Sequence, residues 1–330
     1  MKPIANDRNP TIEVLRVFLM FGICLCHSVG AGGHMCAPIR NVCMMCTVGF
    51  IFITGWFGVR FTLVRVCKLL GIAIFALGVV VIEDVLWHGR ITLSSLVRMR
   101  QWWFLNSYLM LLFLSPILNT IVSCVNSTDG KIRRDALISV LIGAIAIYGL
   151  AWPMHCCWVP RVRFFLTLGC PCQFGTICVI YLLARVVRVT GILDKCKSFY
   201  AGIGLVLSMG LAMYSYKFSY YNSPIAFLFS CSLFYFFQRV IWTRGLFIKL
   251  ILWMSPSMFF VYLYHSHQDP GFKMIKAFEK LLVSSGLCVP IVWLLTAIII
   301  FVLGVAIDVL RREFVRRCFG LIQTRKMVKE

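Results

Sequence analysis

The sequence predicts an all-α integral membrane protein with about ten transmembrane helices. Of its 330 residues, 60% are hydrophobic, which is more apolar surface than a soluble domain of this length can bury. Only 14% are charged, against roughly a quarter in soluble proteins. Apolar runs of the ~17–25 residues that cross a bilayer recur along the chain. Together these observations exclude a soluble protein.

Ten apolar runs are long enough to be laid out as spans. They lie at 12–29, 43–59, 69–87, 103–125, 135–152, 164–184, 199–215, 222–241, 246–265 and 288–310. The run at 199–215 is the weakest, because it is short and contains Gly202, Gly204 and Gly210. No linker, repeat or low-complexity segment divides the chain, so we expect one domain over residues 1–330.

The formal net charge of +21 is explained by membrane topology. Lys and Arg lie mainly in short segments between apolar runs, where they set orientation and contact anionic headgroups. An even number of spans puts both termini on one side, and the segments on that side carry the larger share of Lys and Arg. They include the basic run 311–317. We therefore expect cytoplasmic termini and no nucleic-acid partner. The loop at 90–100 fits this orientation less well, because it places three arginines on the outer side.

The first span carries the most informative pair of residues, Arg16 and His27. At 3.6 residues per turn their spacing is about three turns, so both side chains lie on one helix face, ~16 Å apart along the axis. The run is expected to be an uncleaved span, since Glu13 and Arg16 interrupt it. With cytoplasmic termini, Arg16 lies toward the inner side of the membrane and His27 toward the outer side.

Each of these residues has a structural and a functional interpretation. Arg16 can form an i, i+3 ion pair with Glu13 that anchors the helix start, or it can clamp phosphates or a carboxylate with its bidentate guanidinium. His27 can be an interfacial histidine that bonds a carbonyl, or a general base with a near-neutral pKa. A charge inside a span is costly unless it is paired or faces a cavity, which favours a site.

Four segments together resemble the membrane-bound acyltransferase family 3. Segment 9–27 is similar to the family's first span, in which ten residues separate an Arg from a His after an acidic residue and a Leu. Segment 50–56, Phe-Ile-Phe-Ile-Thr-Gly-Trp, resembles its Phe-rich run ending in Ser-Gly-Tyr/Phe. Segments 102–119 and 255–265 resemble its Trp-Phe…Tyr-Leu…Pro-x-Leu-Asn span and its late Tyr-Leu-x-His span. The likeness covers nearly the whole chain.

The resemblance implies a bacterial inner-membrane O-acyltransferase. Such enzymes move an acetyl or other short acyl group from cytoplasmic acyl-CoA to a hydroxyl of a cell-surface glycan, such as capsule, exopolysaccharide or O-antigen. The family's Arg and His fall on Arg16 and His27, and its Arg-x-x-Arg element falls on Arg65 and Lys68. Arg16, Arg65 and Lys68 are thus expected to hold CoA phosphates, although Lys68 lacks the bidentate fork of the usual Arg.

Further polar residues are expected to support the substrates. They are Glu13, Glu83, Trp103 and His265. Glu83 and Asp84 are adjacent, so at most one of them faces a cavity; the alternative is a salt bridge to the loop with Arg90. His265 matches the family's late His and is expected to orient a substrate or a neighbour. His88, His267 and Asp269 are expected in loops that touch the acceptor.

Trp103 begins a span together with Gln101 and Trp102. An aromatic belt at the membrane interface is the favoured interpretation, and a platform that stacks a sugar ring is the alternative. Asp308, near the inner end of the last span, is expected to pair with Arg311 or Arg312.

No metal is expected, because the spacing of His34, Cys36, Cys43 and Cys46 matches no standard zinc pattern. Thiols within apolar runs act as small packing residues. A disulfide on the oxidising face is the alternative for the cysteines outside the spans.

Two rival functions fit many of the same features. A transporter or exporter of a glycan or small anionic solute also has many spans and cavity-facing polar residues, but we see no repeat between the halves and no matched pair of broken helices. A membrane scaffold working with polysaccharide-assembly proteins would need neither Arg16 nor His27.

Overall fold

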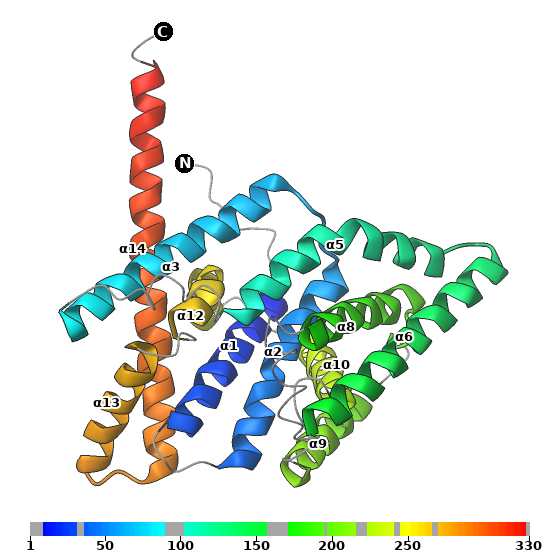
Figure 1. Cartoon of the computed structure of the whole chain (residues 1–330), viewed down its shortest axis with the longest axis horizontal. Helices are drawn as coiled ribbons and strands as arrows, with labels where there is room; N and C mark the ends of the chain where they lie inside the picture. Colours follow the sequence, from blue (N-terminus) through cyan, green and yellow to red (C-terminus); the bar gives the residue numbers. More distant parts are fainter. Residues whose placement is uncertain are drawn as a thin grey trace.

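The described residues of the computed structural model form α-helices and no strand. They are 9–31, 36–89, 102–156, 171–194, 197–215, 223–240, 245–265 and 270–327. Figure 1 shows the helices gathered around α1 and α2, with the C-terminal part of α14 extending beyond the others. The all-helical class predicted from the sequence is confirmed over this part of the chain.

The helices have the following bounds. They are α1 (Pro10–Ala31), α2 (Ala37–Phe57), α3 (Leu63–His88), α5 (Trp103–Val125), α6 (Gly130–Cys156), α8 (Pro171–Thr190), α9 (Ser198–Tyr214), α10 (Pro224–Arg239), α11 (Leu246–Met254), the 3₁₀ turn η2 (Ser255–Ser257), α12 (Met258–His265), α13 (Pro270–Ser284) and α14 (Val289–Met327).

Six helical segments are long and apolar enough to cross a membrane. They are Pro10–Val29, Ala37–Phe57, Leu63–Leu86, Trp103–Val125, Leu246–His265 and Val289–Arg317. These six match the first four and the last two predicted spans, and they make the chain a helical membrane protein. The other four predicted spans overlap helices α6, α8, α9 and α10, of which α9 and α10 are short, with 17 and 16 residues. The count of ten therefore stays a prediction.

Helix α3 begins earlier than the predicted position 69. The hydroxyl of Thr62 accepts a hydrogen bond from the Arg65 backbone N–H at 3.3 Å, which caps the first turn. Before it, α2 ends at Gly58, whose φ of 74° suits a residue without Cβ. The connection between α2 and α3 is consequently only a few residues long and carries Val59 and Arg60.

A single 3₁₀ turn interrupts the predicted span 246–265. Pro256 lacks a backbone N–H and cannot continue the α-helical ladder. Asp308 of α14 lies beside this break: it pairs with Arg311 at 2.7 Å and with Arg312 at 3.1 Å. Arg312 also donates to the Ser257 hydroxyl at 3.0 Å. The predicted pairing of Asp308 is confirmed with both arginines, and it fixes α14 against the broken helix.

Helix α13 was not expected from the sequence. Residues 266–287 lie between two predicted spans, and no helix is predicted for them. The structure instead places a 15-residue helix at Pro270–Ser284. Proline at the first helical position and lysines recurring at 273, 276 and 280 are the local signals of such a helix. The predicted contacts of His267 and Asp269 lie outside the described residues.

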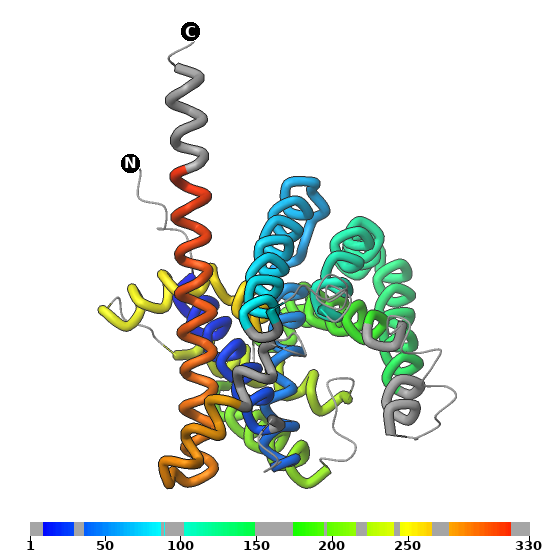
Figure 2. The backbone as a smooth tube through the Cα atoms, turned by 60° about the vertical axis from the view of Figure 1, so that its left-hand side comes forward, coloured from blue at the N-terminus to red at the C-terminus, as the bar shows by residue number. Residues whose placement is uncertain are grey.

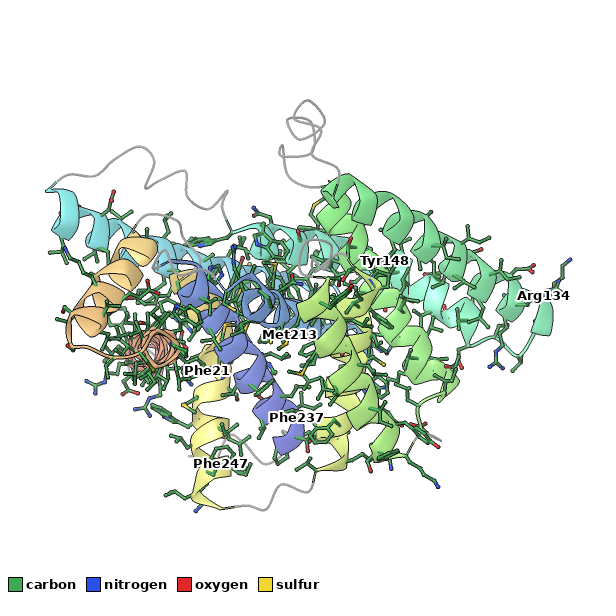
Figure 3. The ribbon with its side chains drawn as sticks, turned by 90° about the horizontal axis from the view of Figure 1, so that it is seen from below. Phe21, Arg134, Tyr148, Met213, Phe237 and Phe247 are labelled. Atoms are coloured by element: carbon green, nitrogen blue, oxygen red, sulfur yellow. The ribbon has the colours of Figure 1, made fainter. Side chains whose placement is uncertain are left out.

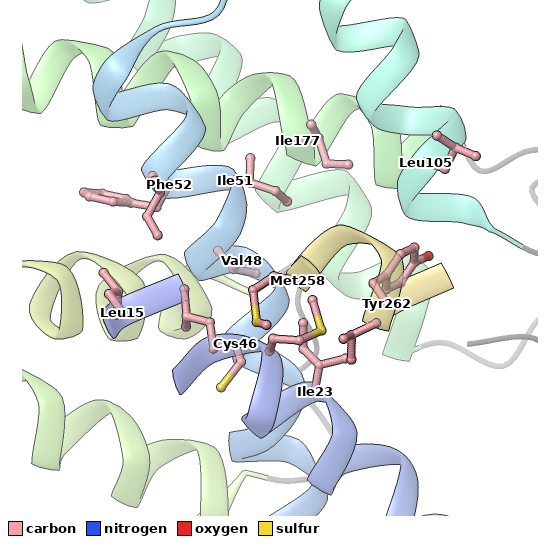
Figure 4. Packing of buried hydrophobic residues seen from close by; sticks show 14 of the residues in the cluster. Leu15, Ile23, Cys46, Val48, Ile51, Phe52, Leu105, Ile177, Met258 and Tyr262 are labelled. Carbon is pink, nitrogen blue, oxygen red and sulfur yellow. The ribbon is translucent and has the colours of Figure 1, made fainter. Parts of the chain in front are cut away.

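One large cluster of buried side chains connects most of the helices. Figure 4 shows its centre, where side chains of α1, α2, α5, α8 and α12 converge. Small residues let α1 and α2 approach closely, since a Cβ at Gly22 or Gly49 would collide with Cys46 or Leu19. Figure 2 shows that the helices cross at varied angles and do not form one parallel bundle.

The outer surface of the helices is apolar. Large side chains such as Ile74, Leu86, Ile145 and Val206 are exposed, as expected where lipid and not water surrounds a protein. The exposed charged side chains of α6 lie in its first turns; they are Lys131, Arg133, Arg134 and Asp135. Figure 3 shows Arg134 at the far end of α6, away from the centre of the molecule.

Candidate functional site: a cavity with a cationic mouth and a histidine pair beyond its inner end

A cavity of about 540 Å³ lies among α1, α2, α3, α5 and α12. Its volume falls in the range of sites for drug-sized ligands. The N-terminal half of α1 forms one wall, with lining residues at 9, 12, 13, 16, 20 and 23. These positions recur every three to four residues and so share one helix face. The spacing of Arg16 and His27 predicts that their side chains lie on this same face of α1.

The mouth of the cavity contains the ion pair expected at the start of α1. Arg16 and Glu13 approach to 3.4 Å, and Glu13 is buried while Arg16 is partly exposed. Both residues also line the cavity. Arg16 therefore both anchors the start of α1 and faces the cavity, because its ion pair with Glu13 forms part of the cavity wall.

Arg65 contributes a second guanidinium to this mouth, but Lys68 does not reach it. Arg65 lines the cavity and donates to the Arg60 carbonyl at 2.9 Å. Lys68 is exposed and is not among the lining residues. The structure thus separates the two cations that the sequence grouped as one phosphate-binding element.

Two hydroxyl groups that were not predicted as site residues face the same cavity. Thr54 and Tyr108 both line it and lie near one another, and the Thr54 hydroxyl donates to the Phe50 carbonyl at 2.9 Å. Tyr108 is within electrostatic range of Arg16 and Arg65. The signal for both residues was present in the sequence, since they lie in two of the four segments that carry the family resemblance.

A closed set of hydrogen bonds holds the connection between α2 and α3. The Tyr181 hydroxyl accepts from the Val59 N–H at 3.1 Å and donates to Asn119 Oδ1 at 2.7 Å. Asn119 in turn donates from Nδ2 to the Val59 carbonyl at 2.8 Å. Val59 lines the cavity. Residues of α5 and α8 therefore hold the backbone of Val59 in place through these bonds.

Two arginines of α8 bind the last turn of α2. Arg188 donates to the Trp56 carbonyl at 2.6 Å and Arg185 donates to the same oxygen at 3.4 Å. The Arg188 guanidinium also lies over the Phe57 ring, 5.6 Å from its centroid. Carbonyls without intrahelical partners carry the negative end of the helix dipole, which explains why cations gather there.

The histidine pair lies one turn further along α1 and α12. The rings of His27 and His265 meet edge to face with centroids 5.0 Å apart. Nδ1 of His265 contacts the Val261 carbonyl and lies 3.9 Å from the Cys24 sulfur. Arg40, at the start of α2, is close enough for its charge to act on His27. Sequence reasoning missed Arg40 because it lies on another helix, before the predicted start of the second span.

Ile23 and Tyr262 separate the cavity from the histidines. Both line the cavity, whereas His27 and His265 do not. Each stands one turn before a histidine, Ile23 before His27 and Tyr262 before His265. The Tyr262 hydroxyl accepts from the Phe104 N–H at 3.2 Å, and its ring centroid is 6.3 Å from that of His265. Figure 4 shows Ile23 and Tyr262 approaching one another from α1 and α12.

The remaining predicted residues lie away from the cavity lining. Glu83 is hydrogen-bonded to Tyr264, and Asp84 is fully buried. Trp103 is partly buried against Phe104. Trp102 is fully buried, so it is a core residue and not part of an aromatic belt.

The structure places most of the cysteine cluster within the packing of α1 against α2. Cys43 and Cys46 are buried, and Cys36 immediately precedes α2. Cys26 donates to the Arg40 carbonyl at 3.6 Å. His34 lies outside the described residues. Among the residues that are described, no three metal-ligating side chains come together.

Comparison with protein-family models, with curated proteins and with solved structures gives no match to this chain. The function is therefore argued from the site itself.

Proposed function

We propose that this protein is a bacterial inner-membrane O-acyltransferase. It moves an acetyl or other short acyl group from acyl-CoA to a hydroxyl of a cell-surface glycan. The observation that carries the proposal is one face of α1. It leads from a cationic, open cavity past Ile23 to a pair of histidines, in which His27 is partly buried and His265 is buried. The resemblance of four sequence segments to membrane-bound acyltransferases points to the same chemistry.

The cationic mouth suits the phosphates of an acyl-CoA. Arg16 and Arg65 supply guanidinium groups, which bind phosphate oxygens through two parallel hydrogen bonds. Thr54 and Tyr108 add hydroxyls beside them. Further in, Met20, Ile23 and Phe104 line an apolar section that suits the thioester arm and a short acyl chain. The acyl carbonyl then lies at the inner end of the cavity, against Ile23 and Tyr262, and these two side chains have to move apart for His27 to reach the reacting groups.

His27 is the group that acts on the acceptor. As general base it takes the proton of the glycan hydroxyl while the oxygen attacks the thioester carbon. The carbon–sulfur bond then breaks, and the CoA thiolate takes the proton from the imidazolium. The products are a glycan ester and free CoA. His265 orients the His27 ring through their edge-to-face contact. The alternative, in which His27 carries the acyl group transiently, uses the same two residues.

A transporter without chemistry is the competing function, because a polar cavity between helices fits it too. The same α1 face distinguishes the two. A transport pathway needs Arg16 to attract an anion, but it should tolerate His27→Gln better than an acyltransferase does, and it would not hydrolyse acetyl-CoA. A scaffold for polysaccharide assembly needs neither residue.

The test is the acetyl content of the host's surface polysaccharide, measured by proton NMR. A deletion strain is complemented with wild type, Arg16→Ala or His27→Ala at matched membrane levels. We expect wild type alone to restore the O-acetyl signals. Arg134→Ala is the matched control, since Arg134 is exposed at the far end of α6 (Figure 3), and we expect it to behave as wild type.

Two results would overturn the proposal. If glycan reaches the cell surface only with wild type and its acetylation never changes, the chain is an exporter. If all variants restore O-acetyl signals equally, neither Arg16 nor His27 takes part in the reaction.

A further inference from the structure

Four arginines surround the end of α2 without a carboxylate partner among the described residues. They are Arg60, Arg65, Arg185 and Arg188. The hydrogen bonds of Arg65, Arg185 and Arg188 go to backbone carbonyls. The carboxylate that lines the cavity, Glu13, is paired with Arg16. The mouth therefore has an excess of positive charge.

The two arginines of α8 are continuous with the cavity. Arg188 lies over the ring of Phe57, a cavity-lining residue that is 48% exposed. Arg185 lies against Gly58, which also lines the cavity, and a Cβ at Gly58 would stand 3.2 Å from the guanidinium. Glycine at this position thus allows Arg185 to approach the cavity wall.

Capping of α2 does not account for both arginines. The end of a helix carries roughly half a negative charge, and one guanidinium at 2.6 Å from the Trp56 carbonyl is sufficient to balance it. An arginine has five N–H donors, and one contact with the Trp56 carbonyl leaves most of them available to a ligand. Stacking on Phe57 additionally holds the Arg188 guanidinium in one orientation.

We infer that Arg185 and Arg188 form a second phosphate subsite at the mouth of the cavity, which binds the 3′-phosphate of the CoA donor. The inference rests on the proposed function. Arg16 and Arg65, which line the cavity itself, hold the pyrophosphate. A cavity of about 540 Å³ encloses the thioester arm but not the nucleotide, so the nucleotide end lies outside, beside Phe57 and the two arginines of α8. A ligand with one carboxylate has no need of so many cations.

The experiment measures CoA and 3′-dephospho-CoA binding by isothermal titration calorimetry. The full chain is reconstituted in phosphatidylcholine nanodiscs, so that no anionic lipid competes. We expect wild type to bind CoA about tenfold more tightly than 3′-dephospho-CoA, the effect of one charge-assisted contact. Arg188→Gln and Arg185→Gln should each weaken CoA binding by about tenfold and change 3′-dephospho-CoA binding less than about twofold.

Other variants serve as controls. Arg65→Ala should weaken the binding of both probes, because both contain the pyrophosphate. Arg134→Ala should change neither. Arg188→Lys keeps the charge and should retain part of the discrimination, which separates loss of charge from disturbed packing. Thermal unfolding of each variant in the same nanodiscs shows whether the fold is retained.

Three results overturn the inference. The first is that Arg188→Gln and Arg185→Gln leave the ratio of the two affinities at the wild-type value. The second is that 3′-dephospho-CoA binds as tightly as CoA, and that phosphatidylglycerol in the nanodiscs weakens CoA binding to wild type but not to Arg188→Gln. In that case the arginines hold a lipid headgroup. The third is that wild type binds neither probe. In that case the proposed acyl-CoA donor is wrong, and so is the subsite for its 3′-phosphate.

Discussion

The mouth and the inner end of the cavity are built in opposite ways. At the mouth, guanidinium groups of α1, α3 and α8 are at least partly exposed. Arg16 pairs with Glu13, whereas Arg65, Arg185 and Arg188 donate to backbone carbonyls. At the inner end, His265 is buried, and Ile23 and Tyr262 separate it and His27 from the cavity. Exposed cations attract and hold an anion, whereas a sheltered imidazole is placed to react. Binding and chemistry are thus assigned to different ends of one helix face.

The largest effect is expected at the inner end. His27→Ala should lower the rate of acyl transfer by about 10²–10⁴-fold, the usual contribution of a general base. CoA affinity should stay within about twofold of wild type, since the mouth is some three turns away. Radiolabelled acetyl transfer in membrane vesicles and calorimetry on the purified protein measure the two quantities. A parallel loss of both would mean that the two ends are not independent.

Arg16→Ala should produce the next largest effect, and at the mouth. We expect CoA affinity to fall by about 10–100-fold, because a bidentate phosphate contact is lost. The substitution also leaves the buried carboxylate of Glu13 without its partner. The double variant Glu13→Gln/Arg16→Ala removes that complication. Affinity restored in the double variant would show that Arg16 only neutralises Glu13 and does not contact the donor.

Tyr181→Phe tests whether the mouth is held in place from outside the cavity. The change removes the hydroxyl that joins Val59 to Asn119. It should cost about 1–2 kcal/mol of stability, as expected for lost buried hydrogen bonds, and weaken CoA binding a few-fold without changing acyl transfer at saturating donor. Thermal unfolding and the split between KM and kcat check this. A fall in kcat at unchanged KM would contradict a role limited to the mouth.

The smallest effect is expected for Lys68→Ala. Lys68 is exposed and does not line the cavity, so CoA affinity should change less than about twofold, in keeping with surface charges at a distance. Arg65→Ala is the matched variant and should weaken binding by about tenfold. Equal losses for the two variants would restore the Arg-x-x-Lys element as one phosphate site.

The sequence allowed the membrane class and the six strongest spans to be predicted, because apolar runs of bilayer length are a local property. The shared face of Arg16 and His27 follows in the same way from helical periodicity. The pairing of Asp308 with the two arginines that follow it could also be predicted, since the three residues lie within one turn of α14.

Features that depend on contacts between distant segments could not be predicted. The bond between Tyr181 and Asn119 joins residues 62 positions apart, and that between Arg188 and Trp56 joins residues 132 apart. Helix α13 was missed for a different reason. It is amphipathic and only 15 residues long, so it gives no signal in a search for continuous apolar runs.

The most direct test of the account is the side of the membrane from which the donor is used. Radiolabelled acetyl-CoA, which does not cross membranes, is added to inside-out and right-side-out vesicles of the glycan-producing host. We predict label in the glycan only with inside-out vesicles containing wild-type protein, and none with His27→Ala. Equal labelling from right-side-out vesicles would contradict entry of the donor through a mouth on the cytoplasmic side. Labelling that does not depend on His27 would contradict the role of this residue in the reaction.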